Sequence, residues 1–172
     1  MLNEKVQEAL NAQINMEFTS SYVYLGMSSY CELNNFPGCA QWLKLQSDEE
    51  TEHAMRLRRF LLDRDCQVKL LPIEGVSTEY TSIPDVFEQS MKQEQAVSKS
   101  IHDLYDLAHQ EKAFAALVEL QWFITEQVEE EKTVRDIVAK FRMIQDDPSA
   151  MIDMDRELGG RVPEEGDGAD GA

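Results

Sequence analysis

Residues 42–62 read WLKLQSDEETEHAMRLRRFLL, and their apolar side chains recur at intervals of three and four residues. That spacing places side chains on one face of an α-helix and predicts a helix here. The face passes through Leu43, Glu50, His53 and Leu57, so a carboxylate and an imidazole interrupt its apolar row halfway along. Glu50 and His53 form a Glu-x-x-His pair, whose i, i+3 spacing directs both groups to the same side of the helix.

Four segments with the same spacing predict four long helices, over residues 3–33, 37–64, 82–109 and 113–144. A Pro-Gly turn joins the first two, and a tight break at residues 110–112 joins the last two, so each pair is antiparallel. The connection between the pairs, residues 66–81, contains Pro72 and Gly75 and has no helical period. At ~3.3 Å per residue it spans about 50 Å, enough to run the length of a ~40 Å helix. The order short, long, short predicts an all-α four-helix bundle with one long crossover.

A short fifth helix is expected to begin at Pro148, which follows an acidic N-cap residue, and to stop at Gly159. Residues 161–172 are rich in glycine and acidic side chains, a composition typical of disorder. We therefore expect one folded domain over residues 1–160, followed by an acidic tail.

The chain carries 33 acidic and 16 basic residues, a formal net charge of -17. This charge repels nucleic acids and anionic membranes and attracts cations. No apolar run approaches the roughly 20 residues of a membrane span, and residues 1–12 lack the apolar core of a signal peptide. We expect a cytoplasmic protein with no membrane or nucleic-acid partner. Cys31, Cys39 and Cys66 form no C-x-x-C pair, which argues against a disulfide framework or a zinc ribbon.

Each helical row is interrupted near its middle by polar groups. These are Glu17 in the first helix, Glu50 and His53 in the second, Glu94 in the third, and Gln127 and Glu130 in the fourth. Glu17 lies 18 residues before Asn35 in the turn and Glu50 lies 15 after it, so at ~1.5 Å per residue their heights differ by about 4 Å. The same count from the second turn places Glu94 at the same height as Gln127 and Glu130 in the fourth helix. The six residues are therefore expected to form one polar layer.

Any single Glu or His of this layer is equally well explained as an ordinary buried polar residue whose hydrogen bonds are satisfied. That explanation does not extend to four glutamates at one level with no Lys or Arg on the same rows. Burying a single unpaired carboxylate already costs several kcal/mol of folding free energy. A divalent or trivalent metal ion supplies the compensating charge. Carboxylate oxygens with one imidazole suit iron or manganese better than the ions that prefer thiolates.

With these residues in these positions, residues 3–160 resemble a bacterial non-haem ferritin, a member of the ferritin-like di-iron family. The resemblance implies a di-iron ferroxidase centre inside each subunit. Glu17, Glu50 and His53 would hold one iron and Glu50 would bridge to the second. The second iron would be held by Glu94 and Glu130, with Gln127 beside them.

The resemblance also implies roles for four further residues. Tyr24 corresponds to a tyrosine that hydrogen-bonds near the centre and supplies an electron; a tyrosine simply packed in the core is an equal alternative. Glu49, Glu126 and Glu129 correspond to a third iron site on the side that faces the cage interior. A solvated acidic face is the other explanation for the acidic run at residues 129–131.

Three departures from the wider superfamily bear on function. Gln127 and Glu130 stand where bacterioferritins repeat the Glu-x-x-His pair, so the second iron lacks a histidine and should be held more loosely. Thr51 stands where bacterioferritins have the haem-ligating methionine, so we expect no haem. Leu117 and Leu120 stand where animal ferritins have acidic channel residues, although Glu119 is near.

The leading hypothesis is iron storage and detoxification. Fe(II) would be oxidised by O2 or peroxide at the di-iron centre, and the ferric product deposited as mineral inside a cage of 24 identical subunits, with the fifth helix at the four-fold axes. The alternative is a small di-iron oxidase or peroxidase with iron as a fixed cofactor. A DNA-protecting shell or an inert structural bundle is a third possibility, against which the missing basic arm and the acidic layer argue.

Overall fold

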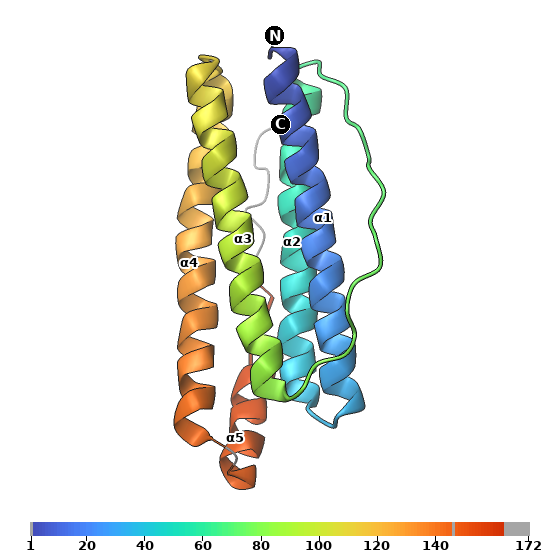
Figure 1. The fold of residues 1–172 in the computed structure, drawn as a ribbon, viewed down its shortest axis with the longest axis vertical. Helices are drawn as coiled ribbons and strands as arrows, with labels where there is room; N and C mark the ends of the chain where they lie inside the picture. The colour runs from blue at the N-terminus through green and yellow to red at the C-terminus, as the bar shows by residue number, and fades with distance from the viewer. Residues whose placement is uncertain (1, 146, 164–172) are drawn as a thin grey trace.

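The computed structural model describes residues 2–145 and 147–163 and shows a bundle of long helices (Figure 1). The helices are α1 (Glu4–Leu33), α2 (Pro37–Asp63), α3 (Ile83–Gln110), α4 (Phe114–Ile144) and the short α5 (Pro148–Gly159). The described residues contain no strand. The expected all-α four-helix bundle with a short fifth helix is confirmed. None of the described helices has the length and apolar content needed to cross a bilayer.

Local sequence signals set the helix ends. The Asn3 side chain caps α1 by accepting a hydrogen bond from the Val6 amide, and Ser82 caps α3 by accepting one from the Asp85 amide. Each of the four long helices is followed by a non-glycine residue with a φ between 50° and 63°. This left-handed backbone conformation ends a helix and turns the chain, and it makes the α1–α2 and α3–α4 connections short.

The crossover from α2 to α3 runs along the outside of α1 (Figure 1). Asn11 of α1 fixes its first part, donating a hydrogen bond to the Gln67 carbonyl at 3.1 Å and accepting one from the Lys69 amide at 2.6 Å. Farther along, a Cβ on Gly26 would lie 2.7 Å from the Ser77 carbonyl oxygen, so glycine is required where the crossover passes this close. The crossover makes α2 and α3 run in the same direction.

The core consists of two apolar clusters separated along the bundle axis. One cluster, at the α5 end, includes Tyr24, Met27, Leu43, Phe87 and Phe141. The other, at the opposite end, includes Leu10, Leu57, Ile101, Leu120 and Phe123. Along every long helix, the residues of the polar layer fall between the stretches that belong to the two clusters. The apolar packing therefore holds the polar layer in place from above and below.

Helix α5 packs across the start of α2. A Cβ on Gly38 would lie 1.8 Å from the Asp155 carbonyl oxygen, and a Cβ on Gly159 would lie 3.0 Å from the Gly38 Cα. The Cys39 amide donates a 2.8 Å hydrogen bond to the Asp155 carboxylate. Because the backbones of α2 and α5 approach each other directly here, no side-chain rotation can make room for a residue larger than glycine at position 38.

We predict that Gly38→Ala displaces α5 and destabilises the subunit by about 2 kcal/mol, the usual cost of forcing an extra methyl group into a packed contact. Thermal unfolding measures the change. The matched control is Gly75→Ala in the crossover, because a Cβ there meets no atom within 4 Å. Equal melting temperatures for the two variants would contradict the tight α2–α5 contact.

Candidate metal centre

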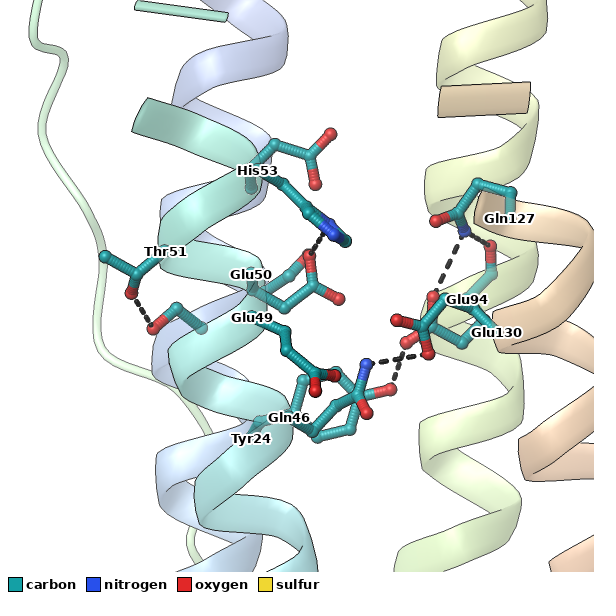
Figure 2. Close-up of polar contacts among 12 residues, drawn as sticks. Tyr24, Gln46, Glu49, Glu50, Thr51, His53, Glu94, Gln127 and Glu130 are labelled. Atoms are coloured by element: carbon teal, nitrogen blue, oxygen red, sulfur yellow. Dashed lines mark hydrogen bonds and ion pairs between the residues drawn. The ribbon is translucent and has the colours of Figure 1, made fainter. Parts of the chain in front are cut away.

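The six residues of the polar layer lie together in the middle of the bundle. They are Glu17 of α1, Glu50 and His53 of α2, Glu94 of α3, and Gln127 and Glu130 of α4, and all are buried. Figure 2 shows the side chains from α2 facing those of Glu94, Gln127 and Glu130 across the bundle axis. The structure therefore brings together the residues that the rows of all four helices predicted at one level.

Glu17, Glu50 and His53 form a group that can hold a metal ion. One potential ligand atom from each lies within 4.8 Å of the others. The Nδ1 atom of His53 is 3.4 Å from Oε2 of Glu50, too far for a strong hydrogen bond. Oε2 of Glu17 and both carboxylate oxygens of Glu50 are buried without a hydrogen-bond partner. Three such oxygens facing one imidazole are a donor set that a cation satisfies.

Neutral donors hold the other half of the centre. Tyr24 donates its hydroxyl hydrogen to Oε1 of Glu94, and the Gln127 amide nitrogen lies 3.1 Å from Oε2 of the same carboxyl group. The Gln46 amide nitrogen donates to Oε2 of Glu130 at 2.8 Å. Dashed lines in Figure 2 mark contacts of this network. These bonds fix the positions of Glu94 and Glu130 without neutralising a charge.

Burial sets the proton affinity of the centre. Loss of hydration raises the pKa of Glu50 and of Glu130 well above 4.5, and the nearby Glu94 charge raises the pKa of both further. Burial also raises the pKa of Glu17 to about 7. For His53 the same loss of hydration lowers the pKa to about 4. In the metal-free centre burial therefore favours the protonated form of these carboxyl groups and the neutral form of the imidazole, which is the form that binds a metal.

The three residues expected at a third iron site occupy different surroundings. Glu49 is half-buried and its Oε2 lies 2.5 Å from Nη2 of Arg161. Glu126 is also half-buried and forms a second potential metal group with His53 and Glu130. Glu129 is exposed. Among the described residues, Glu49, Glu126 and Glu129 do not form one close group, and their joint role stays a prediction.

The chain matches the family model of the ferritin-like domain over residues 7–144, which include the whole polar layer. The chain belongs to the ferritin-like family. It is 32% identical over 165 residues to a bacterial non-haem ferritin of Staphylococcus aureus, covering 96% of this chain and 99% of the relative. It is 34% identical over 159 residues to a probable bacterial non-haem ferritin-like protein of Haemophilus influenzae, covering 92% and 96%. The crystal structure of an open-pore ferritin from Archaeoglobus fulgidus superposes with a TM-score of 0.93 at 42% identity, covering 94% of this chain and 100% of that one.

Within this ferritin-like bundle, sequence reasoning missed several residues that support the centre, among them Gln46, which donates to Glu130. Gln13 donates to Oε1 of Glu17 at 2.8 Å, and Ser100 in turn donates to Gln13 at 2.6 Å. Ser90 hydrogen-bonds the Tyr24 hydroxyl at 2.9 Å. Gln13 stands one helical turn before Glu17, a spacing that could have identified it. Ser90 carries no comparable signal, because small hydroxyl residues occur on every face of these helices.

Thr51 and Glu119, which differ from the wider superfamily or lie beside such a difference, are both found outside the polar layer. Thr51 points away from the centre in Figure 2, and its hydroxyl lies 2.9 Å from that of Ser21. Glu119 is engaged by Arg56, whose Nε lies 2.6 Å from its carboxylate and whose guanidinium stacks on the Trp122 ring at 4.0 Å. A cation that uses Glu119 on its way into the bundle has to compete with this guanidinium.

The raised pKa of Glu17 predicts that the metal-free protein loses stability as the pH rises from about 4.5 to about 7. The folded state holds the extra proton throughout this window, so deprotonation favours the unfolded state. His53 has the opposite effect on stability. Between about pH 4 and 6.5 the unfolded chain binds the proton and the folded protein does not, so this contribution to stability rises with pH. Glu17→Gln removes the first effect and keeps His53, and it should gain about 3 kcal/mol in unfolding free energy, relative to wild type, between pH 4.5 and 7.5.

Urea unfolding of metal-free protein at these two pH values, at one subunit concentration, measures this difference. Glu32→Gln is the control, since Glu32 is an exposed carboxylate on the same helix, and it should keep the wild-type pH dependence. The same pH dependence for Glu17→Gln as for wild type would show that Glu17 gives up its proton without cost.

Proposed function

We propose that this protein oxidises Fe(II) at the buried centre and stores the ferric product inside an oligomeric shell. Membership of the ferritin-like family supports the reaction class. The observation that carries the proposal is the set of three buried carboxylate oxygens of Glu17 and Glu50 that lack hydrogen-bond partners beside the His53 imidazole. Without a cation these oxygens cost stability, and with one they become ligands.

Fe(II) is the substrate, and the two halves of the centre have different parts in binding it. Glu17, Glu50 and His53 bind the first ion, and Glu50, which is completely buried, bridges to the second. Glu94 and Glu130 bind the second ion from the opposite side of the bundle. Binding displaces the protons that burial places on these carboxyl groups, and the resulting negative charges favour Fe(III) over Fe(II), which assists oxidation by O2 or peroxide.

The second half of the centre favours release of iron. Its own side chains are two carboxylates and the Gln127 amide, and we assign the His53 imidazole to the first ion, so the second ion lacks the nitrogen ligand that holds the first. Tyr24 lies against Glu94 and is completely buried, which places a redox-capable phenol in contact with a ligand of this ion. We infer that iron passes through the second position and that Tyr24 supplies an electron during oxidation.

Exposed apolar side chains support an oligomeric shell. Met143 near the end of α4 is 80% exposed and Ile152 of α5 is 51% exposed, which offers an apolar surface for contacts around α5. Leu70 and Leu71 on the crossover add a second such surface on the side of α1. The proposed assembly is a cage of 24 subunits with α5 at its four-fold axes, and the charge of -17 per chain concentrates cations around and within it.

Glu50→Ala and His53→Ala test the centre. Each removes a ligand of the first iron, and we expect the initial rate of Fe(II) oxidation to fall by more than about 100-fold, since the loss of even an outer-shell partner costs 10–100-fold. Stopped-flow absorbance measures the rate. Glu52→Ala is the matched control, because Glu52 is an exposed glutamate on the same helix.

Both variants should still fold: Glu50→Ala removes a buried acid and so lowers the cost of the metal-free centre, and His53→Ala leaves the apolar clusters on either side of the layer intact. Circular dichroism checks this. Rates within twofold of wild type in both folded variants would refute the proposed site.

A further inference from the structure

Arg161 follows α5 and inserts its guanidinium beside the centre. The Arg161 and Glu49 side chains are 17% and 15% exposed, and Nη2 of Arg161 lies 2.5 Å from Oε2 of Glu49. Nη1 donates to Oε1 of Gln46 at 2.9 Å and approaches the Trp42 carbonyl oxygen at 3.4 Å. The guanidinium carbon lies 4.5 Å from the centroid of the Trp42 ring. An ion pair, an amide and an aromatic face therefore fix this cation in place.

A short hydrogen-bonded chain connects Arg161 to the proposed second iron position. Gln46 accepts from Arg161 with its carbonyl oxygen and donates with its amide nitrogen to Oε2 of Glu130 at 2.8 Å. Gln46 is completely buried, so it has no water to exchange for either partner. Burial raises the pKa of Glu130 and the Arg161 charge acts against that rise. Glu49 and Glu130 thus both interact with one cation that belongs to the protein.

The permanent charge of arginine sets up a competition. A guanidinium stays protonated at any physiological pH, so it does not leave Glu49 by losing a proton. A metal ion that takes Glu49 as a ligand must either displace the guanidinium or bind a few ångströms from a fixed positive charge. Either event weakens binding at Glu49 relative to the first two positions, whose carboxylates form no ion pair with Lys or Arg within the described part of the chain.

We propose that Arg161 is a built-in competitor for iron at Glu49, which keeps the third iron position closed until the first two positions are filled. Displacement of its guanidinium opens Glu49 and frees Gln46 to release Glu130, so that iron can leave the second position toward the interior. This inference rests on the proposed function and on the third iron position that the resemblance implies at Glu49. Arg161 acts through Glu49 and Gln46 and is a positioning residue.

The test measures binding of Zn(II), a redox-inert probe, to the full-length metal-free protein by equilibrium dialysis. Arg161→Gln removes the competing charge and should tighten binding of the third zinc ion per subunit by about tenfold. Arg161→Lys keeps the charge and should stay closer to wild type. Arg156→Gln is the matched control, because it removes the same charge from α5 at a site where the side chain is 75% exposed and pairs with Asp153.

Tryptophan emission gives a second readout that needs no change at Arg161. In a Trp122→Phe background the remaining indole is Trp42, which lies under the guanidinium. Its emission should stay constant while the first two zinc ions bind and change when the third displaces Arg161. The same titration with Arg161→Gln should lack this late change.

The outcomes separate the two proposals. If the first two zinc ions bind but the third binds equally well to wild type and to Arg161→Gln, Arg161 only anchors the chain after α5 and the inference is overturned. Constant Trp42 emission through the third ion overturns it as well. If no zinc binds at the centre of any variant, the proposed function fails first.

Discussion

The rest of the structure depends on four carboxyl groups enclosed at one level of a helical bundle without an equal number of cations. Glu17, Glu50, Glu94 and Glu130 are buried between two apolar clusters, and burial raises the pKa of each. In the metal-free protein, protonation and a few neutral donors offset part of this cost. Multivalent cations bound as we propose would offset it more fully. The structure is therefore held in a form that favours metal binding.

The helix connections make this arrangement possible. The crossover lets all four long helices present the middle of one face to the same level, and Gly26 allows it to lie directly on α1. Gly38 lets α5 pack on α2, and the chain leaving α5 carries Arg161 to the edge of the centre. Gly26, Gly38 and Arg161, although far from most of the metal-binding residues in the sequence, thus position the helices around the centre and place a positive charge at its edge.

The sequence predicted the fold and the polar layer because both follow from regular helix geometry. A repeat of three and four residues fixes which side chains share a face, and counting from the turns fixes their level. Arg161 was assigned to the acidic tail, since Gly159 and Gly160 mark the end of α5 and nothing local shows that the next residue folds back onto α2. Glu126 was grouped with Glu49 and Glu129, whereas its position beside His53 and Glu130 depends on side-chain packing that helix spacing does not specify. Residues 164–172, expected to be disordered, lie outside the described residues.

The central claim is that the buried carboxylates bind iron as a substrate and pass it on. Metal-free protein should be mixed with Fe(II) and oxygen, from below to far above two irons per subunit, and the products viewed by electron microscopy. The account predicts a fast oxidation phase that saturates near about two irons per subunit, followed by slower growth of dense cores inside closed shells. A fast phase with no cores would make iron a fixed cofactor, and the absence of any fast phase would contradict the account.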